Sequence, residues 1–238
     1  MNKNSDFRTG FKNGIPIMLG YLAVSFAFGM RVCALGVPWW LAGLISFTNL
    51  TSAGQFAGTN LFLAGAAFAE IALTVLIINS RYFLMSLSLT QKLGTGFGLF
   101  QRLSASYGVT DEIFAVAIGK GGKLSPRYMH GLILGPCIGW TAGAALGGVF
   151  SSLLPELVVS AMGVALYAMF IAIIIPPARE NRPVLFTVLA AITLSVCFEY
   201  IPVFKILGGG WSIIIITVAV AALAATLFPV KEEETAGE

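Results

Sequence analysis

Polar side chains that could hold a small solute interrupt a strongly apolar part of this chain. The candidates are amides, hydroxyls and one guanidinium: Asn49, Thr51, Ser52, Gln55, Asn79 and Arg81. Polar groups at membrane depth lose their hydrogen bonds to water, so they usually face a cavity, a neighbouring helix or a solute pathway. The alternative is hydrogen bonding between helices, worth about 1 kcal/mol for each group. We treat these six as candidate substrate-binding residues.

Three charged residues extend this chemistry. Arg81 keeps its charge at all relevant pH values, and its planar fork matches a carboxylate such as that of an amino acid. Alternatively, its long side chain extends to the membrane interface. Asp111 and Glu112 precede a short apolar piece, 113–118. They are candidates for proton coupling, or they cap a helix whose dipole favours acids in its first turn.

The composition places these residues in a membrane protein. Of 238 residues, 57% are hydrophobic and 11% are charged, with a mean hydropathy of +0.88, whereas a soluble domain carries roughly 25% charged residues. Stretches of about 20 apolar residues can cross a bilayer. They occur at 15–35, 39–63, 66–89, 128–150, 157–175, 184–203 and 211–228. We predict an all-α polytopic membrane protein with six or seven transmembrane helices. Its parts are a cytoplasmic segment 1–12, a single transmembrane domain 13–229 and an acidic tail 230–238.

Basic residues predict the topology. They cluster in 3–12, 92–102, 120–127 and 179–182, and such clusters favour the cytoplasmic side. The first two clusters can both be cytoplasmic only if the chain crosses the membrane an even number of times between them. Three apolar segments lie between them. Segment 39–63 would then re-enter as a hairpin bent near 49–54, and the short segment 104–118 would be a second hairpin. Transporters often place substrate at broken helices of this kind. Alternatively, 39–63 is an ordinary span and one cluster is an exception. Both termini are expected in the cytoplasm.

Several classes of function find no support. The three cysteines are scattered, there is one histidine, and no Walker A loop or HExxH motif occurs. We therefore expect no metal, no cofactor, no enzymatic activity and no nucleic-acid partner. Glycines recur at every fourth position at Gly135, Gly139, Gly143 and Gly147. Such a smooth face predicts close helix packing, either within the protein or with a partner subunit.

Four short motifs carry a resemblance to a known family. They are Gly14-Ile15-Pro16, Ser52-Ala53-Gly54-Gln55-Phe56-Ala57, Ile78-Asn79-Ser80-Arg81-Tyr82 and Thr110-Asp111-Glu112-Ile113-Phe114. In order and spacing the chain resembles the AzlC-type branched-chain amino acid permease family, the large subunits of two-component bacterial exporters. The likeness covers about the first two-thirds of the chain. The family typically has Asn-Leu-Arg-His where this chain ends the third motif with Tyr82, and a phenol cannot repeat the titration of a histidine at neutral pH.

The resemblance implies a secondary transporter in the bacterial inner membrane that exports leucine, isoleucine and valine. It also implies an AzlD-like small multi-span partner and coupling to the proton motive force. In this hypothesis Arg81 holds the substrate carboxylate, and Asp111 or Glu112 supplies proton coupling. Apolar walls near Phe47, Phe56 and Phe83 accept the aliphatic side chain. The alternatives are a channel or carrier for another small solute and a non-transporting membrane scaffold.

Overall fold

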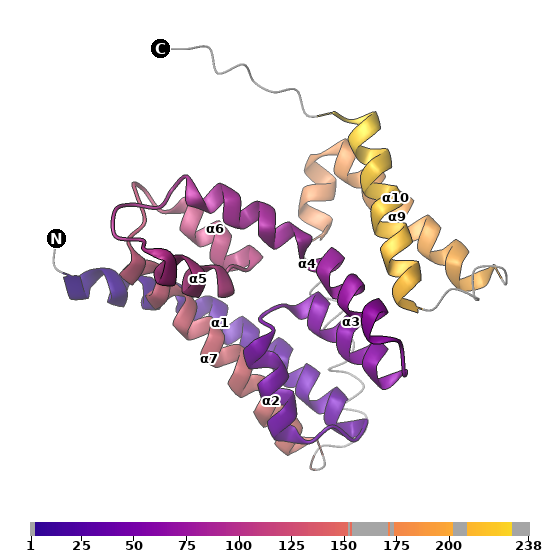
Figure 1. Cartoon of the computed structure of the whole chain (residues 1–238), viewed down its shortest axis with the longest axis horizontal. Coiled ribbons are helices and arrows are strands. Elements are labelled where there is room, and N and C mark those ends of the chain that lie inside the picture. The colour runs from indigo at the N-terminus through magenta and orange to yellow at the C-terminus, as the bar shows by residue number, and fades with distance from the viewer. Residues whose placement is uncertain (1–2, 152, 154–170, 172–173, 202–208, 230–238) are drawn as a thin grey trace. The chain divides into compact units, whose positions relative to one another are not determined.

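Helices joined by loops make up the part of the chain that the structure describes. The computed structural model describes residues 3–151, 153, 171, 174–201 and 209–229, with no strand among them (Figure 1). Five of its helices are long and apolar enough to cross a membrane: α1 (Lys3–Ala34), α4 (Phe68–Thr90), α7 (Pro126–Phe150), α9 (Arg182–Tyr200) and α10 (Gly209–Leu227). The predicted all-α polytopic membrane protein is confirmed. The predicted span 157–175 lies mostly outside the described residues, so the number of crossings stays a prediction.

The two segments expected to re-enter are each broken into two short helices. Segment 39–63 forms α2 (Trp39–Thr48) and α3 (Ser52–Leu63), and the region around 104–118 forms α5 (Leu99–Tyr107) and α6 (Asp111–Gly119). A helix of ten residues is about 15 Å long, half the thickness of a bilayer core of about 30 Å. The predicted break in 39–63 therefore exists, although it ends before Gly54, which lies inside α3. Whether the segment crosses or re-enters stays a prediction.

The chain forms two compact units. One comprises Met1–Thr59 and Ile78–Tyr167, and the other comprises Asn60–Ile77 and Ala168–Glu238. The boundaries fall inside α3 and α4, so each of these helices contributes to both units. All the candidate site residues belong to the first unit.

Close packing of α1 against α7 is the main helix contact of the first unit (Figure 1). The predicted stripe of glycines on α7 forms this contact. A Cβ atom built on Gly139, Gly143 or Gly147 would lie 2.4, 2.1 or 2.0 Å from an atom of α1, too close for any side chain. The predicted close packing is confirmed, and these glycines lie against a helix of the same chain.

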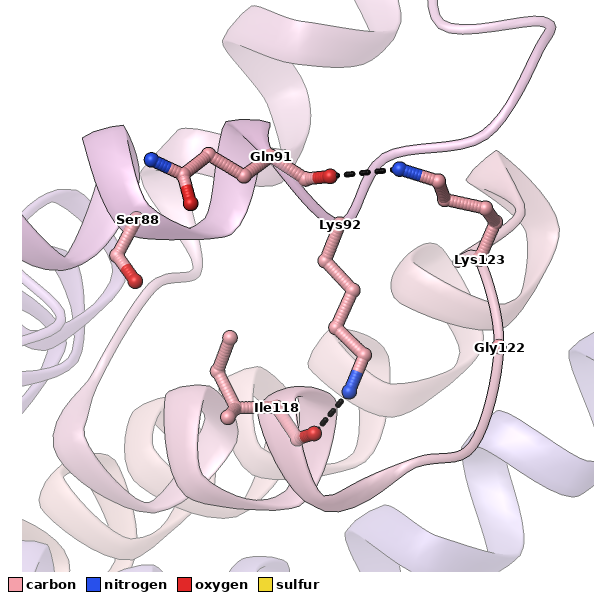
Figure 2. Close-up of a pocket in the computed structure, with 6 residues that line it drawn as sticks. All are labelled: Ser88, Gln91, Lys92, Ile118, Gly122 and Lys123. Carbon is pink, nitrogen blue, oxygen red and sulfur yellow. Dashed lines mark hydrogen bonds between the residues drawn. The ribbon is translucent and has the colours of Figure 1, made fainter. Parts of the chain in front are cut away.

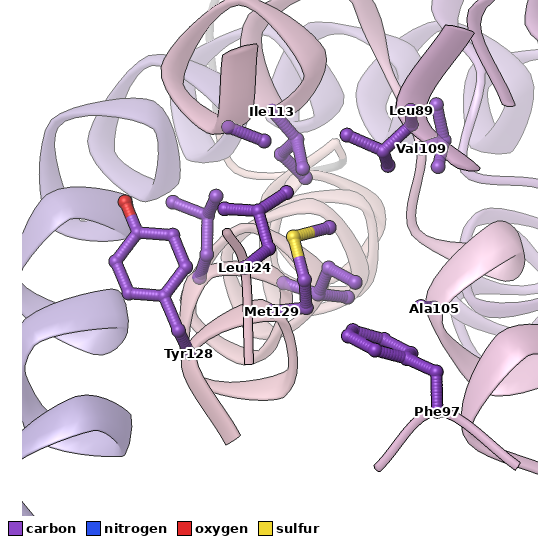
Figure 3. Close-up of a cluster of buried hydrophobic side chains, with 11 residues drawn as sticks. Leu89, Phe97, Ala105, Val109, Ile113, Leu124, Tyr128 and Met129 are labelled. Carbon is purple, nitrogen blue, oxygen red and sulfur yellow. The ribbon is translucent and has the colours of Figure 1, made fainter. Parts of the chain in front are cut away.

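A cluster of buried apolar side chains fixes the two short helices α5 and α6 (Figure 3). It includes Leu89 at the end of α4, Ala105 of α5, Ile113 of α6 and Met129 of α7. Ile113 and Ala117 of α6 are fully buried in this cluster, which packs α6 against α7. The acids at the start of α6 thereby gain a defined position.

The second unit contains a buried acid at a helix start. Glu70 is only 8% exposed, and its Oε1 accepts a hydrogen bond of 2.9 Å from the backbone N–H of Gly210 in the first turn of α10. The first amides of a helix have no partner within the helix and carry partial positive charge. Glu70 therefore satisfies one of them from a neighbouring helix.

Candidate functional site

An ion pair between α4 and α6 lies at the centre of the polar residues. Nη1 of Arg81 is 2.7 Å from Oδ2 of Asp111, and the two side chains are 40% and 30% exposed. The guanidinium thus pairs with a carboxylate of the same chain, and its depth in the membrane stays a prediction. Both side chains are only partly covered by the rest of the described chain. Arg81 has donors to spare, since a guanidinium carries five N–H groups.

Tyr82 continues the network from this ion pair to the break between α2 and α3. Nη2 of Arg81 donates to the Tyr82 hydroxyl at 3.2 Å, and that hydroxyl donates to Oγ1 of Thr51 at 3.2 Å. Thr51 in turn donates to Oδ1 of Asn79 at 2.9 Å. The structure therefore brings Thr51, Asn79, Arg81 and Asp111 together. Tyr82 was missing from the predicted site, although its hydroxyl stands in the same polar tetrapeptide as Arg81.

Gln55 is part of a separate, fully buried polar contact. It is 1% exposed; its Nε2 donates to Oγ of Ser46 at 2.7 Å, and its Oε1 accepts from Nε1 of Trp140 at 2.9 Å. These bonds join α2, α3 and α7, which makes Gln55 a brace between helices. Its predicted contact with substrate stays a prediction.

The bare backbone of Gly54 permits the neighbouring contact. A Cβ atom at Gly54 would lie 2.9 Å from Nδ2 of Asn79 and 3.0 Å from Cγ2 of Thr51. The glycine thus allows α3 and α4 to approach where Asn79 meets Thr51.

The two acids at the start of α6 do more than interact favourably with the helix dipole. The cap is Thr110, whose Oγ1 accepts from the backbone N–H of Ile113 at 3.4 Å. Glu112 accepts a hydrogen bond from the hydroxyl of Tyr21 on α1, and that hydroxyl also lies 2.7 Å from Oγ1 of Thr110. Asp111 and Glu112 therefore bind α4 and α1, respectively, while both occupy the first turn of α6.

The environment of Asp111 affects its protonation. This residue lies outside the five candidate spans. Burial raises the pKa of its carboxyl above the ordinary value of 3.8, the Arg81 guanidinium opposes the rise, and the charge of Glu112 adds to it. A raised pKa means that the protonated form is populated at a higher pH than for a free aspartate.

Two of the predicted residues lie apart from these contacts. Asn49 is the C-cap of α2 and Ser52 is the first residue of α3; both are half-buried. Within the described part of the chain, neither side chain hydrogen-bonds to the polar residues above. The polar residues at this helix break were all predicted to contact the substrate. Of Asn49, Thr51 and Ser52, only Thr51 hydrogen-bonds to a residue of α4.

The predicted apolar walls differ in their surroundings. Phe56 is buried, and its ring meets that of Phe28 edge-on with the centroids 5.0 Å apart. Phe47 and Phe83 are exposed. Over the described residues, no group of three or more His, Cys, Asp or Glu side chains could hold a metal ion.

The chain is similar to several known membrane proteins. The family described as AzlC protein matches residues 16–154. A membrane protein of Archaeoglobus fulgidus is 33% identical over 187 residues, which are 76% of this chain and 80% of that protein. The inner membrane protein YgaZ of Escherichia coli is 28% identical, over 80% of this chain and 83% of its own length.

A third relative carries a functional name. The branched-chain amino acid transport protein AzlC of Bacillus subtilis is 31% identical, over 64% of this chain and 62% of its own length. No solved structure matches the chain. The family match spans more than half of the 238 residues and includes every predicted site residue. The chain therefore belongs to the AzlC family.

Proposed function

We propose that this chain is the large subunit of a secondary transporter that exports leucine, isoleucine and valine across the bacterial inner membrane. It works with an AzlD-like small multi-span subunit and uses the proton motive force, with both of its own termini in the cytoplasm. The name of the Bacillus subtilis relative supports the substrate class. Five candidate spans support a multi-pass membrane protein.

The ion pair of Arg81 and Asp111 carries the proposal. A free amino acid has one carboxylate and one ammonium, and both charges need partners when they leave water. At 2.7 Å, Arg81 and Asp111 satisfy each other. A substrate that enters between them gives its carboxylate to the Arg81 fork and its ammonium to Asp111. The number of paired charges in the site does not fall in this exchange.

The neighbouring hydroxyls and amide orient the two charged groups. Tyr82 holds the guanidinium through its hydroxyl, and Thr51 fixes that hydroxyl and Asn79 together. Thr51 and Asn79 therefore line the path from Arg81 to the break between α2 and α3. Asn49 and Ser52, at the same break, are nearby groups that a change of side-chain conformation would bring to the substrate.

Proton coupling is assigned to the two acids of α6. The raised pKa of Asp111 favours proton uptake. Protonation of Asp111 would remove the carboxylate that holds the substrate ammonium, so a proton that binds there would favour release of the substrate. Glu112, hydrogen-bonded to Tyr21, is the second candidate. If Glu112 carries the proton, Glu112→Gln is expected to abolish proton-driven net efflux but to preserve exchange of leucine across the membrane. Asp111→Asn should abolish both, because the substrate ammonium loses its partner.

The rival function of a scaffold has lost its main support. The glycine stripe on α7 would favour an assembly role if it were free for another subunit. It packs instead against α1 of the same chain. No observation on the described residues now favours a scaffold over a transporter.

The decisive experiment measures efflux of preloaded leucine, isoleucine and valine from cells. The chain is expressed with and without an AzlD-like small membrane protein, and a protonophore serves as a control. We expect faster efflux only with both chains and its loss with the protonophore. Absence of efflux of all three amino acids, with both chains present in the membrane, would refute the proposed substrate.

Site variants then locate the substrate. Arg81→Gln is expected to abolish efflux while the protein still inserts, because the fork for the carboxylate is gone. Arg102→Gln is the matched control, since Arg102 donates to the backbone carbonyl of Phe97 on the loop before α5. Full efflux by Arg81→Gln would remove Arg81 from the site. Equal losses in both variants would point to a general effect of removing an arginine.

A further inference from the structure

A pocket with two lysines in its lining lies away from the ion pair, in the first unit, between the ends of α4 and α6. It has a volume of about 350 Å³ and is lined by Ser88, Gln91, Lys92, Ile118, Gly122 and Lys123 (Figure 2). The side chain of Lys92 reaches from the end of α4 to the carbonyl of Ile118, and Nζ of Lys123 donates to the carbonyl of Gln91 at 2.8 Å. Two ammonium groups therefore line one small pocket.

The positive charge of this pocket is not neutralised by acids. Within the described residues the ion pair of Arg81 and Asp111 is the single salt bridge, so neither lysine has a carboxylate at ion-pair distance. Carbonyls at the C-terminal ends of helices attract lysines, which explains where the ammonium groups lie. Each ammonium has three donors and uses one on its carbonyl. Donors remain on both lysines for an anion.

The pocket also lies where two candidate spans end. The span of α4 ends at Thr90 and that of α7 begins at Pro126, and the lining residues fall just before or between these positions. The two loops are fixed to each other, because Gly94 donates to the carbonyl of Leu124 at 2.9 Å and Leu124 donates to that of Lys92 at 2.9 Å. The lysines therefore lie next to the ends of two candidate spans, in loops that are hydrogen-bonded to each other.

We propose that this pocket binds a phosphate group, either of an anionic lipid headgroup or of free phosphate. Basic pockets at the cytoplasmic ends of transmembrane helices bind phosphorylated headgroups in this way. Lys92 and Lys123 supply the charge. The hydroxyl of Ser88 and the amide of Gln91, which line the same pocket, supply further donors. The site lies outside the substrate path and requires no transport activity.

Native mass spectrometry of the detergent-solubilised full chain tests the proposal. Dioleoylphosphatidylglycerol, dioleoylphosphatidylcholine and inorganic phosphate are titrated separately. The test variant is Lys92→Gln with Lys123→Gln. The matched control is Lys120→Gln with Lys12→Gln, which removes the same charge without touching the lining; Lys120 lies over the ring of Tyr128 instead. Lys92→Arg with Lys123→Arg keeps the charge, and melting curves report whether each variant folds.

We expect the glutamine test variant to bind phosphatidylglycerol about 30-fold more weakly, because each lysine near an anionic lipid surface contributes about fivefold in affinity. The matched control and the arginine variant should stay within about threefold of the original chain. If inorganic phosphate binds with the same dependence on Lys92 and Lys123 but phosphatidylglycerol does not, the site is for the free anion. Unchanged binding of both probes in the test variant, or an equal loss in the matched control, would overturn the proposal. If the test variant does not fold, a loss of binding in the folded arginine variant would argue against a charge-based phosphate site, and retention would support it.

Discussion

Replacing Gly147 by alanine should force α7 away from α1. A Cβ atom at this position would lie 2.0 Å from the backbone oxygen of Phe26, whereas ordinary van der Waals contact starts at 3.4 Å. The obstacle is a backbone carbonyl inside a helix, so it cannot rotate aside as a flexible side chain would. Overpacking of this kind costs about 1–3 kcal/mol, and we expect the upper part of that range.

The gain in helix propensity offsets only part of this cost. Alanine is better than glycine in a helix by about 1 kcal/mol. The expected net loss of stability for Gly147→Ala is therefore about 2 kcal/mol. Trp140 on α7 contacts the ring of Tyr21 on α1 and donates a hydrogen bond to Gln55. If α7 moves away from α1, we also expect this hydrogen bond to weaken.

Gly135→Ala is the matched control on the same stripe. The nearest atoms to a Cβ at Gly135 are 3.7 Å away, which is ordinary contact. That variant should be unchanged or more stable by up to about 1 kcal/mol. Thermal unfolding of the purified chain in detergent, followed by tryptophan fluorescence and by size-exclusion chromatography after heating, compares the two. If Gly147→Ala proves as stable as Gly135→Ala, the close approach of α1 and α7 is refuted.

Three further substitutions test the contacts around the site. Tyr82→Phe removes the hydroxyl that receives a hydrogen bond from Arg81; efflux should fall at least several-fold with little change in melting temperature, and unchanged efflux would contradict an orienting role. Trp140→Phe leaves the buried oxygen of Gln55 without its donor and should cost about 1–3 kcal/mol, measured by thermal unfolding; a cost near zero would show that another group satisfies the oxygen. Thr110→Ala removes the cap of α6 and should cost about 1 kcal/mol, whereas Thr110→Ser should restore most of it; equal stability of the two variants would exclude the capping role.

Much of the fold could be predicted because the membrane imposes strong rules on sequence. Apolar stretches of about 20 residues predict spans, and α4, α7, α9 and α10 follow them closely. Helix α1 begins at Lys3, within the predicted N-terminal segment 1–12 and well before the predicted span 15–35. The polar run at 49–51 interrupts an apolar segment, and the helix ends there. The start of α5 at Leu99, ahead of the predicted short segment 104–118, was not predicted. The hydrophobic pattern of such a short amphipathic helix resembles that of a loop with a few apolar contacts.

The partners of the polar residues were harder to predict. Tyr21 and Glu112 are 91 residues apart in the chain, and Gln55 and Trp140 are 85 apart. In an apolar segment Tyr21 and Trp140 read as ordinary aromatic residues, because nothing local shows where their polar atoms point. The hydroxyl of Tyr82 also bonds to Thr51, 31 residues away, and that contact could not be predicted either.

The hydrogen bonds of the polar residues distinguish those that join helices around the candidate site from those that could bind a solute. Gln55 is 1% exposed and both ends of its amide have partners, so contact with a solute would require breaking bonds that join three helices. Arg81 and Asp111 are 40% and 30% exposed, and their bond can be exchanged for two bonds to a zwitterion. A polar residue in a span is a candidate ligand by composition alone. Its role is decided by whether its donors and acceptors are already used, and by this criterion Arg81 with Asp111 ranks above Gln55.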